Sequence, residues 1–213
     1  MRKTAPIIIT GECYNSYYEK IGDETVCIDD QIPFEIPMTW AWVRMKKVCN
    51  INPRNNIPDN TEVSFIPMPL IKEGFANAHT SEKRLWAQVK TGFTHFCEND
   101  VGVAKITPCF ENRKSVIFHN LINGVGAGTT ELHILRPQNG VAIPEYILTI
   151  LKTDSFIIGG VQTFSSAVGQ QRISKDYVAD YLVPLPPYHE QMRICKQISY
   201  VLNMLSEIEA SLN

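Results

Sequence analysis

The sequence predicts an α+β fold, with one mixed globular domain followed by a long amphipathic, coiled-coil type helix at the C-terminal end. Short apolar segments bounded by turn residues dominate the first part of the chain, whereas helical patterns come mostly later. The final segment carries an apolar repeat at spacings of 4, 3, 4, 3 and 4 residues. A chain of 213 residues with 44% hydrophobic residues can bury a substantial core without a metal or disulfide.

The first part of the chain divides into a leader and a strand-rich region. Residues 1–32 are interpreted as an acidic leader or linker without strong periodicity, and the globular domain is expected to span residues 33–187. The Asn- and Pro-rich residues 51–60 predict a loop. Strand candidates are residues 40–45, 63–66, 93–96, 101–107, 115–119 and 131–135.

The period changes after residue 143. Residues 144–153 predict a helix, because Pro144 suits a first helical turn. The pair Gly159-Gly160 predicts a break, and Ser174 is a candidate N-cap for a short helical turn over 174–179. A strand over residues 181–185 then leads into the terminal helix.

The terminal helix is expected to span residues 188–213. Pro187 and Glu190 suit its start, and residues 188–212 would extend about 37 Å at about 1.5 Å per residue. Its apolar stripe has the a/d rhythm of a coiled-coil seam, which predicts a helical partner; the alternative is a helix that lies on its own domain. The seam residues are Ile194, Ile198, Val201, Leu205, Ile208 and Leu212.

Charge is distributed unevenly along the chain. The net charge of −2 argues mildly against a nucleic-acid partner, yet residues 33–130 carry 11 Lys and Arg against 8 Asp and Glu. Six scattered cysteines without a C-x-x-C pair predict reduced thiols. The apolar run at residues 6–10 is too short for a signal peptide or a membrane span, so a cytoplasmic protein is expected.

No motif predicts catalysis or metal binding. The glycine-rich residues 124–130 lack the Lys of a phosphate-binding loop and precede a strand pattern, so they predict a turn or close-approach loop. The five histidines do not fall at metal-binding spacings, and there is no G-x-S-x-G motif.

Basic and amide side chains beside turn signals are the candidates for DNA binding. Arg recognises guanine edges, and Gln or Asn recognises adenine edges in the major groove. The same side chains could equally be solvated surface residues. The candidates are Lys83, Arg84, Lys90, Arg113, Lys114, Gln170, Gln171 and Arg172.

Five sequence blocks follow one another in a distinctive order. The two most specific are Gly169-Gln170-Gln171-Arg172-Ile173 and Val183-Pro184-Leu185-Pro186-Pro187, the latter followed by Glu190-Gln191-Met192-Arg193-Ile194. The others are residues 32–45, residues 99–114, and Gly128-Thr129-Thr130-Glu131 with Leu135-Arg136-Pro137. Together they resemble the specificity subunits of type I restriction–modification systems. The segment Asn112-Arg113-Lys114 departs from the family's usual Asn-Gly-Lys.

The resemblance implies a target recognition domain over residues 33–187 and a conserved spacer or dimerisation helix over residues 188–213. Such a subunit reads one half of a split site in double-stranded DNA and docks the methyltransferase (M) subunit. It contacts the motor–nuclease (R) subunit indirectly. It is not an enzyme and has no cofactor, because S-adenosylmethionine and ATP are used by the partner subunits.

The resemblance also bears on assembly. A full subunit has two recognition domains and two long helices, so this chain is expected to be a half-subunit or a fragment. A homodimer through the C-terminal helix would rebuild a two-domain reader. Three alternatives remain open: an assembly or decoy subunit with weak DNA binding, the recognition module of a fused restriction–methylation enzyme, and a small hydrolase.

Overall fold

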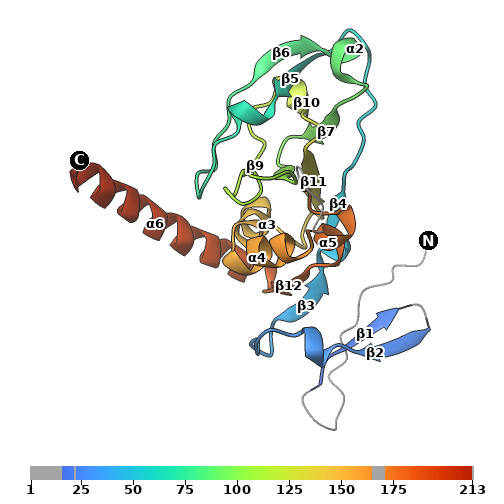
Figure 1. Ribbon diagram of the computed structural model, residues 1–213, viewed down its shortest axis with the longest axis vertical. Coiled ribbons are helices and arrows are strands. Elements are labelled where there is room, and N and C mark those ends of the chain that lie inside the picture. Colours follow the sequence, from blue (N-terminus) through green and yellow to red (C-terminus); the bar gives the residue numbers. More distant parts are fainter. Residues whose placement is uncertain (1–15, 22, 165–170, 213) are drawn as a thin grey trace.

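The computed structural model describes residues 16–21, 23–164 and 171–212. These residues form two four-stranded β-sheets, two two-stranded sheets, a layer of short helices and one projecting helix (Figure 1). The expected α+β class and the long C-terminal helix are confirmed. The strands are β1 (Tyr18–Ile21), β2 (Glu24–Cys27), β3 (Ala41–Arg44), β4 (Cys49–Ile51), β5 (Glu62–Ile66), β6 (Glu82–Leu85), β7 (Thr94–Cys97), β8 (Val101–Ala104), β9 (Ser115–Ile117), β10 (Val125–Gly128), β11 (Leu132–Pro137) and β12 (Leu182–Leu185). The α-helices are α1 (Met45–Val48), α2 (Trp86–Val89), α3 (Pro144–Leu151), α4 (Asp154–Gln162), α5 (Lys175–Asp180) and α6 (Tyr188–Leu212), and 3-10 turns are η1 (Asp29–Gln31), η2 (Met68–Leu70) and η3 (Ile122–Gly124).

The distal sheet has the strand order β6-β5-β10-β7, with β5 and β10 parallel and the other pairs antiparallel. The central sheet has the order β4-β11-β8-β9 and is antiparallel throughout. A hydrophobic cluster joins residues of both sheets, and in it the rings of Phe96 and Phe118 stack with centroids 3.7 Å apart. The two sheets therefore share one core.

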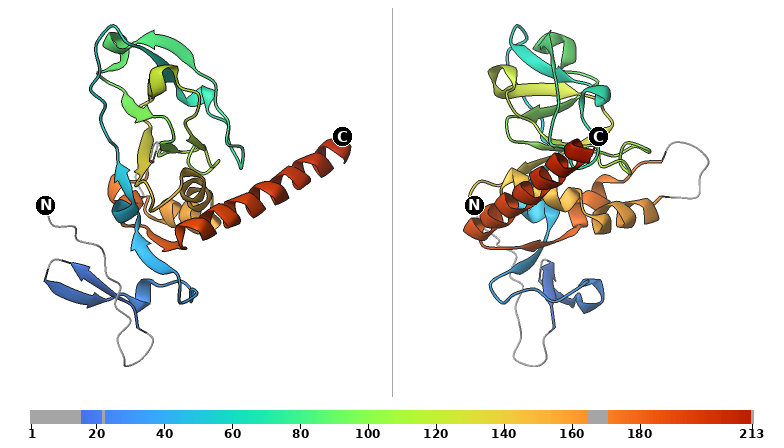
Figure 2. Two further views of the ribbon diagram at one scale, coloured as in Figure 1. Left: turned by 180° about the vertical axis from the view of Figure 1, so that it is seen from behind. Right: turned by 90° about the vertical axis from the view of Figure 1, so that its left-hand side faces the viewer.

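The helices cover the lower side of the central sheet, where the largest hydrophobic cluster lies (Figures 1 and 2). It contains Met45 from α1, Ile147 and Leu151 from α3, Phe156 from α4 and Cys195 from the start of α6. Only the first turns of α6 are anchored in this way. The rest of α6 extends away from the body of the molecule (Figure 2).

The strands β3 and β12 pair antiparallel, which places Ala41 beside Leu185. The β1–β2 hairpin and η1 lie within residues 1–32, the segment interpreted as a leader without strong periodicity. Arg44 ties the hairpin to the domain, because its Nε donates to Glu19 Oε2 at 3.0 Å and its Nη1 donates to the Asp180 carbonyl at 2.8 Å.

The later elements are largely those that the sequence predicts. Pro144 stands in the first turn of α3, and the Ser174 side chain accepts from the Tyr177 backbone N–H at 3.0 Å as an N-cap. The predicted break at Gly159-Gly160 is wrong, because both residues lie inside α4. A Cβ at Gly160 would lie 2.5 Å from the Phe110 ring, and one at Gly159 would lie 2.9 Å from the Tyr177 hydroxyl. These glycines give room to neighbouring rings.

The glycine-rich segment forms the inner strand β10 and not only a turn. The close approach that glycine predicts is confirmed: a Cβ at Gly128 would lie 2.3 Å from the Ile66 carbonyl oxygen, and one at Gly126 would lie 2.2 Å from the Phe96 ring. The strand expected over residues 101–107 ends earlier, at Ala104. The short elements α1, β4, β6 and α2 have no counterpart among the elements expected from the sequence.

Candidate nucleic-acid interface

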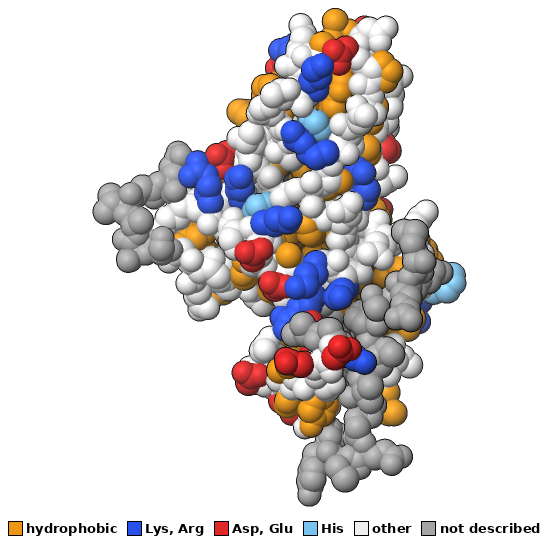
Figure 3. Space-filling model, turned by 90° about the vertical axis from the view of Figure 1, so that its right-hand side faces the viewer, with side chains coloured by type: hydrophobic (Ala, Val, Ile, Leu, Met, Phe, Trp, Pro, Cys, Tyr) orange, Lys and Arg blue, Asp and Glu red, His pale blue; other side chains and the backbone are white. Residues whose placement is uncertain are grey.

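One side of the molecule, turned away from the projecting part of α6, carries a row of Lys and Arg side chains over both sheets and down to α1 (Figure 3). We call this surface the basic face. It has an upper part beside β7, a central part around His133, and a lower part on α1. The cations that meet at these parts are Arg54 and Lys90 near His95, Lys105, Arg172 and Lys175 near His133 and Glu131, and Lys46 and Lys47 on α1.

The central part is built by two segments that are far apart in the sequence. Ile106 and Arg172 form an isolated antiparallel bridge, and the Thr107 N–H donates to the Gln171 carbonyl at 3.0 Å. Arg172 donates to both carboxylate oxygens of Glu131, at 2.8 and 2.9 Å, and this pairing lowers the pKa of Glu131. The bridge therefore holds Arg172 beside Lys105.

His133 is buried beneath these side chains, and its neutral ring adds no charge to the basic face. Burial lowers its pKa, and the charges of Lys105 and Lys175 lower it further. Its Nδ1 accepts from the Asn52 amide at 3.2 Å and its Nε2 donates to the Ile173 carbonyl at 3.1 Å. A neutral ring thus supports Lys105 and Lys175 from below.

The lower part of the face is α1, a four-residue helix that displays Lys46 and Lys47 to solvent. Lys46 pairs with Asp180 at the end of α5. Lys46 and Lys175 also line one shallow depression of about 520 Å³, together with the exposed amide side chains of Asn50 and Gln138. This depression connects the lower part of the face with the central part.

The upper part lies beside β7. Arg54 Nη1 donates to the Phe93 carbonyl at 2.9 Å, and Lys90 pairs with Asp59 at 2.8 Å. His95 joins them, because its Nε2 donates to the Lys90 carbonyl at 3.0 Å and its Nδ1 accepts from the Asn55 backbone N–H at 3.2 Å. The exposed Arg54 is thereby held on a loop with fixed anchor points.

The structure brings only part of the sequence-predicted DNA-binding set together. Lys90, Gln171 and Arg172 belong to or adjoin the basic face, and Gln170 lies outside the described residues. Lys83 and Arg84 stand on β6, the edge of the distal sheet opposite to β7, where they pair with Glu62 and Glu82.

Arg113 and Lys114 have internal partners on another surface. Arg113 pairs with Asp154, donates through Nε to the Lys152 carbonyl at 3.1 Å, and lies over the Phe75 ring. Lys114 Nζ donates to the Met68 carbonyl at 3.4 Å. The sequence reasoning omitted Lys46, Lys47, Arg54 and Lys175; the adjacent Lys46-Lys47 pair was the signal that could have identified the lower part.

The apolar seam of α6 is divided between two environments. Ile194 packs against the main core, and Ile198 lines an apolar groove together with Leu202 and Leu148. The remaining seam residues are at least half exposed, with Leu205 at 50% and Leu212 at 80%. Those that face solvent are Val201, Leu205, Ile208 and Leu212.

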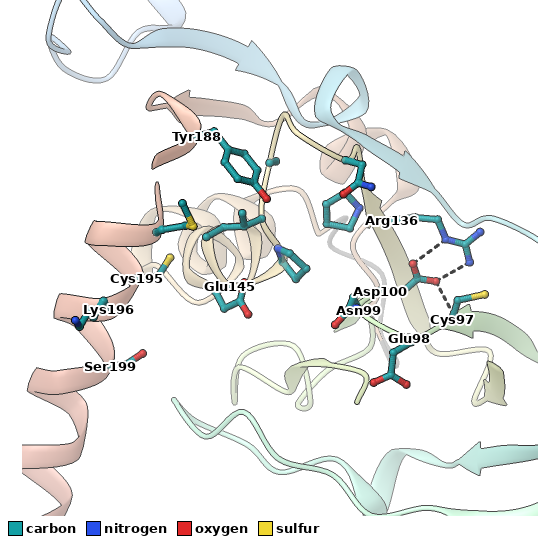
Figure 4. A pocket seen from close by; sticks show the side chains of 16 residues that line it. Cys97, Glu98, Asn99, Asp100, Arg136, Glu145, Tyr188, Cys195, Lys196 and Ser199 are labelled. Atoms are coloured by element: carbon teal, nitrogen blue, oxygen red, sulfur yellow. Dashed lines mark hydrogen bonds and ion pairs between the residues drawn. The ribbon is translucent and has the colours of Figure 1, made fainter. Parts of the chain in front are cut away.

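A wider cleft of about 870 Å³ lies between the first turns of α6 and the β7–β8 connection (Figure 4). Asp100 is buried at its margin and accepts from Arg136 Nε at 2.8 Å, from Arg136 Nη2 at 2.7 Å and from the Cys97 backbone N–H at 2.7 Å. These three bonds hold the Asp100 carboxylate in one orientation at the margin of the cleft. Across the described ranges, no three His, Cys, Asp or Glu side chains are placed to hold a metal ion.

Solved structures of restriction–modification proteins have the same fold. The HsdS subunit from Thermoanaerobacter tengcongensis superposes with a TM-score of 0.68 at 18% identity, over 84% of this chain and 46% of that chain. A second solved chain, from work on complex assembly and conformational transition of the type I R-M system, gives 0.68 at 19% identity over the same shares. The fold class is therefore that of a type I specificity subunit.

Sequence comparison identifies the family. Residues 37–213 match the type I restriction modification DNA specificity domain, and the chain belongs to this family. The specificity subunits of the type I restriction enzymes EcoEI and EcoAI from Escherichia coli are 40% and 38% identical over 182 residues, or 85% of this chain. The chain spans about a third of their length, 31% in each case.

The family assignment confirms what the sequence blocks predict. Specificity subunits are the non-catalytic members of type I systems, in which S-adenosylmethionine and ATP are used by partner subunits. The family to which the chain belongs is thus one of DNA specificity domains. In the part of the chain that the structure describes, no helix is both long and apolar enough to cross a membrane.

Proposed function

We propose that this chain reads one half of a bipartite site in double-stranded DNA, and that it does so through the basic face. The continuity of that face over both sheets is the observation that carries the proposal. Phosphate contacts from Lys and Arg supply most of the affinity and fix the register of a protein on the duplex. Sequence is then read by side chains that reach base edges. The proposal places the chain with the DNA in the cytoplasm.

A charge-neutralised variant tests the assignment of the face. The substitutions Lys47→Gln, Lys105→Gln and Lys175→Gln remove two exposed cations and one half-buried cation, Lys105, from the basic face. We expect weaker binding of duplex DNA in fluorescence anisotropy, with the slope of log K against log salt reduced by about 3. The matched control is Lys83→Gln with Arg84→Gln on β6.

The control decides between the two basic surfaces. A normal salt slope in the β6 variant, together with a reduced slope in the triple variant, supports the basic face. The reverse result would assign DNA binding to the edge of the distal sheet, as part of the sequence-predicted set implies. If both variants bind DNA as the wild type does and still dock the M subunit, the result would favour the alternative function, that of an assembly or decoy subunit.

We further propose that the exposed half of α6 pairs with the α6 helix of a second copy, in antiparallel orientation. Its a/d side chains form one stripe, and an apolar stripe of this kind is buried in a coiled coil. Such a dimer would carry two recognition domains and prefer an inverted repeat with a fixed gap. Docking of the M subunit, and through it of the R subunit, completes the proposed assembly.

Sedimentation equilibrium at tens of micromolar tests the pairing. We expect a dimer for the wild-type chain and a monomer for Leu205→Glu, because a carboxylate in the seam would be desolvated by the partner helix. Glu209→Gln is the control on the same exposed half of α6. A wild-type monomer, or a dimer that Leu205→Glu leaves intact, would contradict the pairing.

A further inference from the structure

The segment between β4 and β5 runs from the central sheet to the distal sheet along the basic face (Figures 1 and 3). We call its residues 53–58 the edge segment. More buried and exposed side chains alternate along it, as in a β-strand. The more buried ones are Pro53, Asn55 and Ile57, and the exposed ones are Arg54, Asn56 and Pro58. Residues two apart in an extended segment are about 6.5 Å apart, so Arg54 and Asn56 can reach one duplex together.

The edge segment is fastened to β7 and to the residue before it. The Asn55 backbone N–H donates to His95 Nδ1 at 3.2 Å, and the Asn55 side-chain amide donates to the Phe96 carbonyl at 2.9 Å. Arg54 Nη1 donates to the Phe93 carbonyl at 2.9 Å. Because β7 is an edge strand of the distal sheet, the edge segment forms a fixed outer layer on that edge. Side chains held on a fixed backbone lose less entropy when they bind a ligand.

The Asn side chains beside the basic face differ in whether they already have hydrogen-bond partners. The Asn52 side chain bonds to His133 Nδ1 at 3.2 Å and accepts from the Ile134 N–H at 2.8 Å, and the Asn55 side chain bonds to β7. Asn56 is exposed, and its amide has no hydrogen-bond partner among the residues that the structure describes. Its donor and its acceptor are therefore both available to a ligand.

Two other exposed amide side chains, Asn50 and Gln138, lie on a surface of different shape. They line the shallow depression beside Lys46 and Lys175. Base edges lie at the floor of a major groove about 8.5 Å deep, so they are reached by an element that enters the groove. The edge segment with β7 behind it has the form of a two-stranded ribbon, which the major groove admits.

The charges near Asn56 favour the approach of DNA. Arg54, which is exposed on the same side of the edge segment, has no acidic partner among the described residues. Asp59, the acidic residue that follows in the chain, is paired with Lys90 at 2.8 Å. The positive charge beside Asn56 is therefore available to a phosphate group.

We propose that Asn56 is a specificity-determining residue that reads the edge of an adenine in the major groove, while Arg54 holds a nearby phosphate. The inference rests on the proposed function and names a base-reading side chain within it. An Asn amide pairs with adenine by donating to N7 and accepting from the N6 amino group. These are the donor and the acceptor that Asn56 has free.

Selection of DNA by the full chain, from a library of duplexes with a randomised core, tests this proposal. Sequencing of the selected duplexes should show a wild-type preference for adenine at one position by about tenfold. Asn56→Ala should select the other positions of the motif but not this adenine. Fluorescence anisotropy measures the preference, with a selected duplex and with one in which the A·T pair is replaced by G·C.

Two control variants lie on the same loop. Arg54→Gln should weaken the binding of all duplexes alike and reduce the slope of log K against log salt by about 1, with the adenine preference retained. Asn60→Ala removes an exposed amide from the following turn, in which the Thr61 N–H donates to the Pro58 carbonyl at 3.0 Å. It should change neither affinity nor preference. An unchanged salt slope on unselected duplexes shows that Asn56→Ala is folded.

The outcomes separate the base-reading residue from the wider function. If Asn56→Ala keeps the adenine preference, the inference is overturned while the proposed function stands. Equal weakening of all duplexes by Asn56→Ala also overturns it, because the amide would then contact the DNA backbone. Loss of preference at a base other than adenine overturns the assignment of the base. A wild-type chain that selects no motif overturns both the inference and the proposed function.

Discussion

At the scale of single residues, two buried histidines are fixed in one neutral form. The Asn55 N–H and the Asn52 amide donate to Nδ1 of His95 and His133, so each Nε2 carries the proton and donates to a backbone carbonyl. Protonation of Nδ1 would break the donated bond in each case. Burial accordingly lowers the pKa of both rings.

This arrangement predicts a pH dependence of stability. The unfolded histidines have a pKa of about 6.5, so below that pH the unfolded state binds more protons than the folded state. The free energy of unfolding should therefore be constant just above pH 7 and fall as the pH drops from about 6.5 toward the lowered pKa values. Urea denaturation at pH 7.5, 6.5 and 5.5 measures it.

The variant His133→Gln isolates the contribution of one ring. It should be less stable than wild type at pH 7.5, because the bond to the Ile173 carbonyl is weakened, but should lose less stability between pH 7.5 and 5.5. An identical decrease in both proteins would show that His133 does not titrate on unfolding.

Lys152 is a buried lysine whose ammonium donates to the carbonyls of Gly74, Ala76 and Arg113. Burial lowers its pKa to about 8, and the charge of Arg113 contributes to that shift. Lys152→Met should decrease the free energy of unfolding by about 2–3 kcal/mol, because three carbonyls lose their donor. Hydrogen exchange should increase at the amides of Gly74, Ile117 and His119. Lys72→Met, at an exposed position near Gly74 in the chain, is the control. Equal effects of both variants would show that the bonds from Lys152 to the Gly74, Ala76 and Arg113 carbonyls do not stabilise the protein.

At the scale of elements, β10 depends on the absence of side chains. Gly128→Ala would place a methyl group 2.3 Å from the Ile66 carbonyl oxygen, where backbone and not a flexible side chain must move. We expect a loss of about 2 kcal/mol or more in thermal or urea unfolding. Ala127→Gly in the same strand is the comparison, with loss of one buried methyl. A Gly128→Ala protein as stable as wild type would mean that β5 and β10 can separate at little cost.

Helices long enough to repeat their apolar pattern over several turns were predictable from the sequence, whereas helices of a single turn were not. α6 spans 25 residues and α3 starts at a proline, so period and capping both mark them. α1 and α2 have four residues each, which is too short for a helical period. The prediction at Gly159-Gly160 was wrong because glycine can either end a helix or make room for a neighbouring side chain inside one. The sequence does not show that Phe110 and Tyr177 pack against this part of α4.

The candidate site was predictable only in part for a related reason. Arg172 lies beside Lys105 because residues 106 and 172 form a bridge, a pairing over 66 positions that no local pattern indicates. Arg113 stands in a turn, as basic DNA-binding residues often do, but Asp154 and Phe75 hold it elsewhere. Residue type and turn context locate exposed cations and do not reveal which of them share a face.

At the scale of the whole molecule, the basic face and the free part of α6 lie on different sides (Figures 1 and 3). Reading and assembly should therefore be separable. We expect Leu205→Glu to bind a single half-site duplex within about twofold of wild type, while losing the preference for an inverted repeat. Anisotropy with the two duplexes, at equal salt concentration, measures both. A large loss on the single half-site would show that α6 itself contacts DNA.

The pairing of β3 with β12 has a consequence for how such a domain can be exchanged. Because Ala41 lies beside Leu185, the chain enters and leaves the globular domain at neighbouring positions. The residues between these strands therefore form an exchangeable segment whose two ends lie side by side. Replacing it by another segment with the same closing strands would leave the start of α6 in place, so that a new specificity could be grafted without rebuilding the scaffold.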